Sequence, residues 1–133
     1  MKTHMIHIIL GIVFVFTSTL ISDEFTNNDL KVWKTQYESV VKEGRKVFTD
    51  TTLGTNTVTC NECHPNASNT HPETYPKFQK QLGKVVTIAE MINWCIANPL
   101  EGKRMAVDDA RMTAIISYIT EERKGVKLSP GKH

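Results

Sequence analysis

Apolar residues recur with the period of an α-helix in three segments of the chain, and the first segment runs from Leu30 to Phe48. Asn28 or Asp29 is available as its N-cap. Gly44 lowers the helix propensity of this segment by about 1 kcal/mol relative to Ala, so we expect the glycine to permit close approach of another helix. The apolar positions of the segment are Val32, Trp33, Tyr37, Val40, Val41, Val47 and Phe48.

A second helical segment is predicted around Cys95. It opens with a capping-box sequence at residues 87–90 and ends near Ala97, before an Asn-Pro pair. Ile88 and Ile92 precede Cys95 by seven and three residues, so the thiol shares their apolar face and is expected to point inward.

Long loops separate the helical segments. Residues 49–59 are rich in Thr, Gly and Asn, and residues 65–76 contain three prolines, so no long regular element is expected in either. The third helical segment begins after Asp108 and ends near Gly125, a residue that suits the position just past a helix end. The pattern therefore predicts a small all-α fold with long loops.

The strongest chemical signal is the C-x-x-C-H sequence formed by Cys60, Cys63 and His64, which is the attachment signal of a c-type haem. The two thiols form thioethers with the porphyrin, and the imidazole is the proximal iron ligand. One such motif predicts one covalent haem c. The alternatives are a zinc site, for which only His71 and Cys95 could add ligands nearby, and a redox dithiol, which would need a βαβ unit.

The N-terminus predicts export. Lys2 precedes an apolar run at residues 6–16 and a Thr/Ser stretch, which is the layout of a secretory signal peptide. The run is shorter than the roughly 20 apolar residues that a membrane span needs. We expect residues 1–22 to be a signal peptide and residues 23–133 to form a single domain in the periplasm or another exported compartment, with no stable membrane span after removal of the leader. An uncleaved membrane anchor is the alternative.

Composition adds two constraints. The formal net charge of the 133 residues is +2, so no charge field favours nucleic acid as a partner. The chain has three cysteines, and since the haem uses two of them, Cys95 requires an explanation.

Most of the mature chain resembles the class I cytochromes c. Gly44 begins a stretch similar to the first-helix signature of that family, in which the glycine permits crossing with the last helix, and Tyr118 would occupy the facing position. Four further stretches resemble a narrower family, the cytochrome c domains of thiosulfate dehydrogenases and of the haem subunit of sulfur-oxidising complexes. These stretches are residues 53–56, 63–66, 75–79 and 92–103.

The resemblance implies that Cys95 is the sixth iron ligand, opposite His64. In most class I cytochromes the sixth ligand is a methionine on the loop before the last helix, and Met105 is that alternative here. A thiolate stabilises Fe(III) over Fe(II), so its bond to the iron weakens on reduction, and protonation can then release it.

The sequence therefore predicts an exported monohaem cytochrome that transfers one electron and can bind a diatomic gas such as NO or CO after release of Cys95. Similar small cytochromes occur in heterodimers, so the expected partner is a second c-type cytochrome subunit. The alternative is the haem subunit of a thiosulfate- or sulfur-oxidising enzyme, in which Arg104, Lys103 or Lys84 could hold an anionic substrate. One C-x-x-C-H motif provides one haem, so we do not expect a self-sufficient enzyme.

Overall fold

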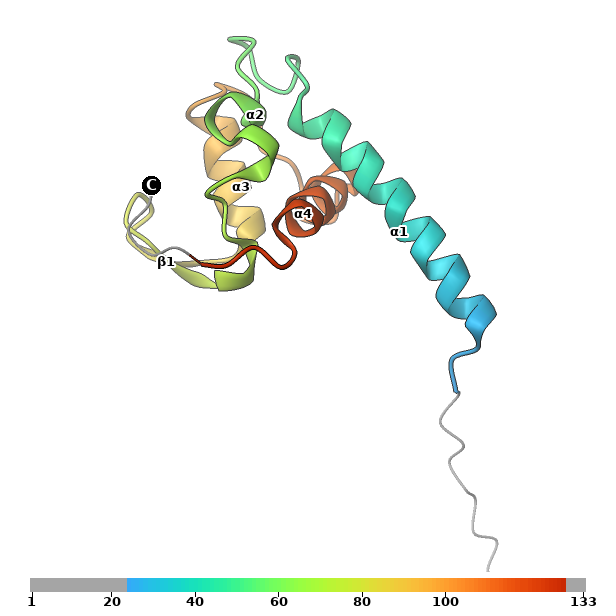
Figure 1. The fold of residues 1–133 in the computed structure, drawn as a ribbon. Coiled ribbons are helices and arrows are strands. Elements are labelled where there is room, and N and C mark those ends of the chain that lie inside the picture. The colour runs from blue at the N-terminus through green and yellow to red at the C-terminus, as the bar shows by residue number, and fades with distance from the viewer. Residues whose placement is uncertain (1–23, 129–133) are drawn as a thin grey trace, which may run out of the picture.

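The computed structural model describes residues 24–128, which are mostly helical (Figure 1). The elements are α1 (Asn27–Phe48), α2 (Cys60–Cys63), the 3-10 helices η1 (Pro65–Ala67) and η2 (Pro72–Thr74), the strands β1 (Lys77–Gln79) and β2 (Lys84–Val86), α3 (Ile88–Ala97) and α4 (Ala110–Arg123). The prediction of an all-α fold with long loops is confirmed. The predicted signal peptide lies outside the described residues, and none of the helices within them is long and apolar enough to cross a membrane.

The crossing of α1 and α4 is the main helix contact of the fold. Gly44 is buried at this crossing, and a Cβ atom added to it would overlap the Ala114 carbonyl oxygen and lie 2.7 Å from Tyr118 Cβ. One turn further along α1, the Phe48 ring packs on Tyr118 with centroids 5.1 Å apart. The predicted role of the glycine is therefore confirmed.

The start of α1 differs from the prediction. Thr26 is the N-cap, rather than Asn28 or Asp29, and the helix begins at Asn27. The Asp29 carboxylate accepts from the Thr26 backbone N–H at 2.9 Å, while Thr26 Oγ1 accepts from the Asp29 N–H at 3.2 Å. The capping box uses polar residues that precede the apolar stripe, so a start inferred from the first apolar residue, Leu30, falls too late.

The β1–β2 hairpin was not predicted. Its strands pair antiparallel, with Phe78 opposite Val85, and each strand has three residues. Strands of this length are too short for an alternating pattern to be distinguished from a loop. The segment 65–76 forms only η1 and η2, as expected.

The loop before α2 is tied to the segment that follows α3. The Thr55 N–H donates to the Leu100 carbonyl at 3.0 Å, and Asn56 Nδ2 donates to the Pro99 carbonyl at 2.8 Å. These contacts join the loop that leads into Cys60 to the end of the helix that carries Cys95. The two sequence regions with cysteine chemistry are thereby held together.

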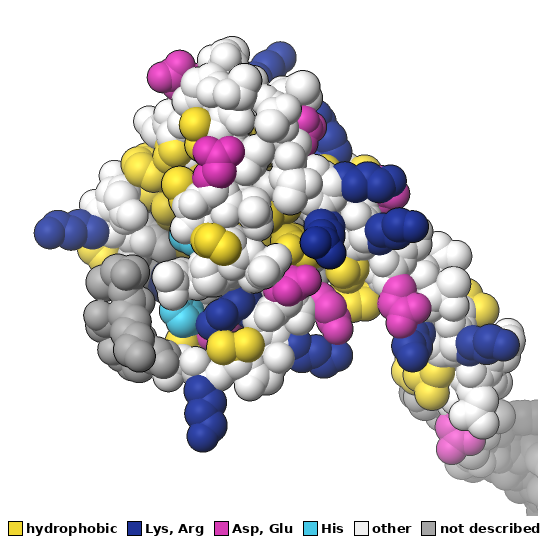
Figure 2. All heavy atoms as spheres, turned by 45° about the horizontal axis from the view of Figure 1, so that its top comes forward, with side chains coloured by type: hydrophobic (Ala, Val, Ile, Leu, Met, Phe, Trp, Pro, Cys, Tyr) yellow, Lys and Arg dark blue, Asp and Glu magenta, His cyan; other side chains and the backbone are white. Residues whose placement is uncertain are grey.

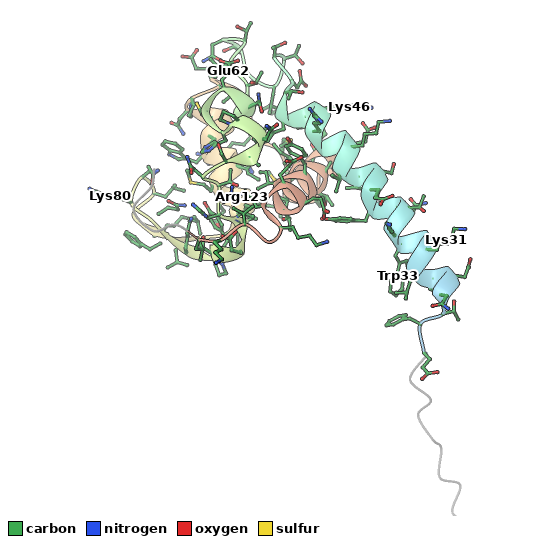
Figure 3. The ribbon with its side chains drawn as sticks, in the orientation of Figure 1. Lys31, Trp33, Lys46, Glu62, Lys80 and Arg123 are labelled. Atoms are coloured by element: carbon green, nitrogen blue, oxygen red, sulfur yellow. The ribbon has the colours of Figure 1, made fainter. Side chains whose placement is uncertain are left out.

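The apolar core lies between the C-terminal half of α1, α3, α4 and η1. Its largest fully buried side chains belong to Phe48, Ile96, Met112, Ile115 and Tyr118. The N-terminal half of α1 projects away from this core, and Figure 3 shows Trp33 on the projecting part.

Candidate haem site

One short helix positions the C-x-x-C-H motif. α2 begins at Cys60, and the His64 N–H donates to the Cys60 carbonyl at 2.9 Å where the helix ends. At the start of the helix, the Glu62 carboxylate accepts from the backbone N–H of the N-cap residue Thr59 at 3.3 Å. Because residues three apart share a helix face, Cys63 lies on the same side of α2 as Cys60, and His64 is the C-cap residue directly after it.

The imidazole of His64 is oriented by a backbone carbonyl. His64 Nδ1 lies 2.8 Å from the Ser68 carbonyl oxygen, and since a carbonyl only accepts, Nδ1 must carry the proton. Nε2 is then the nitrogen with the free lone pair. Metal-binding histidines commonly have this arrangement, in which the second nitrogen donates to a backbone carbonyl.

The three cysteine thiols are free and lie within electrostatic reach of each other. Burial, and next the charge of Cys95, raise the pKa of Cys60 to about 12. Burial, and next the charge of Cys63, raise the pKa of Cys95 to about 11. The Cys60 and Cys95 thiols are therefore neutral at pH 7 unless a bound cation stabilises a thiolate or the sulfur is alkylated.

Cys95 is half-buried on the apolar face of α3, as predicted. Ile92 and Ile96 on the same helix are buried in the core. Tyr75 is also half-buried, and its hydroxyl accepts from Gln79 Nε2 at 2.7 Å. Burial raises the pKa of Tyr75, and the charge of Cys95 contributes to the shift, so this phenol belongs to the surroundings of the thiol.

Met105, the alternative sixth ligand, is buried against α3 with 6% of its surface exposed. Asn93 fixes its backbone from both sides, since Nδ2 donates to the Met105 carbonyl at 2.9 Å and Oδ1 accepts from the Met105 N–H at 2.8 Å. Both sulfur candidates therefore depend on α3 for their position.

The donor set of this site fits a covalent haem. Cys60 and Cys63 form no disulfide in the described part of the chain, so both sulfurs are open to thioether formation, and His64 has a free Nε2. Arg123 Nε is the single buried side-chain N or O atom of residues 24–128 without a hydrogen-bond partner, and a carboxylate from a bound group would satisfy it. No three His, Cys, Asp or Glu side chains in the described part of the chain are grouped so that they could hold a bare metal ion.

Two contributors to the site carry no motif. They are the Ser68 carbonyl and the Asn93 amide. Of the basic residues considered for an anionic substrate, Lys84 and Arg104 line a cavity beside α3, and Lys103 does not line it.

Comparison with known proteins places the site in a family. Residues 43–128 match the family described as "SoxA/TsdA, cytochrome c domain". A thiosulfate dehydrogenase from Psychrobacter arcticus is 34% identical over 73 residues, which cover 49% of this chain and 22% of that protein. The L-cysteine S-thiosulfotransferase subunit SoxA of Rhodovulum sulfidophilum is 28% identical over 116 residues, which cover 85% of this chain and 37% of that protein.

The chain thus spans 22% and 37% of the lengths of these two relatives. The family match covers most of the described residues and includes the C-x-x-C-H motif, α3 and α4. It confirms the predicted c-type cytochrome of the sulfur-oxidation type and its covalent haem c. The chain belongs to the SoxA/TsdA family of cytochrome c domains.

Proposed function

We propose that this protein is a monohaem electron carrier whose iron is bound by His64 and Cys95. The observation that supports this most directly is the pairing of an oriented imidazole with a half-buried thiol in electrostatic reach of the motif cysteines. When bound, the haem supplies a one-electron Fe(III)/Fe(II) couple. One haem per chain then means one electron per chain.

The residues of this chain would each have a defined part in electron transfer. Cys60 and Cys63 would tether the porphyrin, and the Ser68 carbonyl, which holds Nδ1 of His64, would leave Nε2 to bind the iron. Ile92 and Ile96 exclude water from the thiol side. A thiolate at Cys95 lowers the reduction potential relative to a methionine sulfur, because its negative charge favours Fe(III).

Two variants test the axial ligands. We expect Cys95→Ala to lose the low-spin thiolate signature in the EPR and absorption spectra of the ferric protein and to raise its reduction potential. Met105→Leu should keep the low-spin thiolate signature and the reduction potential of the wild type. An unchanged spectrum in Cys95→Ala together with a changed one in Met105→Leu would assign the sixth position to Met105.

Binding of NO or CO is part of this proposal. The apolar side chains of Ile92 and Ile96 beside Cys95 favour a neutral ligand over a hydrated ion. In dithionite-reduced protein, CO binding should follow release of Cys95, so Cys95→Ala should bind CO faster. If CO changes the absorption spectrum of neither protein, gas binding is refuted and electron transfer remains as the proposed function.

The second candidate function is that of a haem subunit in thiosulfate or sulfur oxidation. It is favoured by the two relatives, a thiosulfate dehydrogenase and a thiosulfotransferase subunit. This chain spans 22% and 37% of their lengths, and we propose a second c-type cytochrome subunit as its partner in this function. Thiosulfate-dependent reduction of the haem, measured alone and with a candidate partner, tests this function.

We also propose that the protein acts in the periplasm after loss of residues 1–22. The apolar run and its flanking polar residues support export. N-terminal sequencing of the mature protein from the periplasmic fraction tests it, and an intact N-terminus in the membrane fraction would instead support the anchor.

A further inference from the structure

A second candidate site lies on the other side of α3 from Cys95. A cavity of about 350 Å³ opens between α3, the β1–β2 hairpin and the segment before Met105. At about 100° per residue, Glu90 and Asn93 lie roughly 140° and 160° around the helix from Cys95. The lining includes Gln81, Leu82, Lys84, Asn93, Trp94 and Arg104.

The charge of this cavity is positive. Lys84 Nζ donates to the Glu90 carboxylate at 2.9 Å, so these two lining charges neutralise each other. Arg104 also lines the cavity, and no ion pair of Arg104 occurs among the residues that the structure describes. Its guanidinium therefore keeps five donors and a full charge for a ligand.

The position of Arg104 is fixed by its neighbour. Both backbone polar groups of Met105 are bonded to Asn93, at 2.8 and 2.9 Å, so the chain at Arg104 is held against α3. A donor whose backbone is already fixed loses less conformational entropy when it binds a ligand.

The other residues that line the cavity indicate whether it suits a bare inorganic ion or an organic anion. Trp94 and Leu82 are half-buried and give the cavity apolar surface, while Gln81 adds an amide. A volume of about 350 Å³ falls at the lower end of small-molecule sites, which span roughly 300–1,000 Å³. A single tetrahedral ion would leave part of this volume unfilled.

We propose that this cavity binds a small organic anion, with an oxyanion head on Arg104 and an apolar part against Trp94 and Leu82. This binding goes beyond the proposed electron transfer, since it uses neither the iron nor its ligands. It also gives Arg104 a role distinct from holding a substrate at the haem.

Calorimetric titration of the haem-loaded protein with benzenesulfonate and with sulfate tests the proposal. We expect saturable binding of benzenesulfonate, and weaker binding of sulfate because it has no apolar part. Arg104→Gln should weaken benzenesulfonate binding by about tenfold or more, since it removes the charge-assisted hydrogen bond to the oxyanion head.

Lys103→Gln is the matched control. It removes the same charge one residue away, from an exposed side chain that does not line the cavity, so it should change the affinity by no more than about twofold. Equal loss in both variants would mean unspecific attraction to positive charge. That result, or a titration without saturation, would overturn the proposal, and an unchanged Soret spectrum and melting temperature of each variant would show that it is folded.

Discussion

The Asn93 side chain binds both backbone polar groups of Met105. Because Asn93 is half-buried, Asn93→Ala leaves these groups without their partner, and each lost hydrogen bond costs about 1 kcal/mol. We expect the free energy of unfolding of the haem-loaded protein to fall by about 2 kcal/mol in urea denaturation. Asn98→Ala, which removes one exposed bond to the Trp94 carbonyl, is the control and should cost less.

Glu90 predicts a pH dependence of stability. The hydrogen bond from Lys84, and next that from the Thr87 backbone, lower the pKa of the Glu90 carboxyl from 4.5 to about 2. A folded-state pKa below the unfolded one stabilises the fold above the unfolded pKa, and the stabilisation is lost as the pH falls through the folded pKa. Glu90→Gln should therefore lower the Tm at pH 7, and by less and less as the pH falls from about 4.5 to about 2.

Thermal unfolding at a series of pH values measures this effect. Glu101→Gln is the control, because the Glu101 side chain is exposed and takes part in no ion pair among the described residues. A Tm difference between wild type and Glu90→Gln that stays constant over the pH range would refute the linkage.

The sequence reveals the motif residues of the site but not the groups that position the site residues. Cys60, Cys63 and His64 follow from spacing alone, because covalent attachment requires adjacent residues. The Ser68 carbonyl carries no side-chain signal, since any residue type presents one. Asn93 acts on a residue 12 positions away, so its role appears only once the loop after α3 is folded back onto the helix.

The crossing of α1 and α4 gives a test in which two effects of opposite sign compete. Gly44→Ala raises the intrinsic helix propensity by about 1 kcal/mol. The new Cβ would overlap the Ala114 carbonyl, so the helices must separate, at a cost of about 1–3 kcal/mol and more where backbone is displaced. We expect a net loss of stability in urea denaturation. Lys42→Ala on the exposed side of α1 is the control, and a stabilised Gly44→Ala would contradict the close approach.

The apolar period predicted α3 and α4 well, because both helices pack one face on the core and begin at a polar cap, Thr87 or Asp109. For α1 the period predicted the helix and its end at Phe48, but it does not show which part of the apolar stripe is buried. The stripe continues towards the N-terminus through Trp33 and Leu30, although α4 reaches only as far as Tyr37, whose hydroxyl donates to the Ser117 carbonyl at 3.4 Å. Periodicity shows which residues share a face but not whether another element covers it.

The length of α1 explains why part of its stripe is exposed in the molecule as a whole. Its 22 residues extend about 33 Å, whereas the 14 residues of α4 extend about 21 Å. Figure 2 shows hydrophobic side chains among charged ones on the projecting part of α1. Phe25 lies edge-on against Trp33 there, with ring centroids 4.6 Å apart, and both remain at least 49% exposed.

Burial of apolar side chains should therefore stabilise the fold mainly around the crossing of α1 and α4, and much less along the projecting part of α1. Leu30 on α1 is 52% exposed, and Ile115 on α4 is fully buried, although both are four-carbon aliphatic side chains on helices. Ile115→Ala should cost about 2–5 kcal/mol, because it removes buried methyl groups and leaves a cavity. Leu30→Ala should stay within about 0.5 kcal/mol. Urea denaturation of the haem-loaded protein compares them, and a large loss for Leu30→Ala would mean that the exposed stripe is covered in solution.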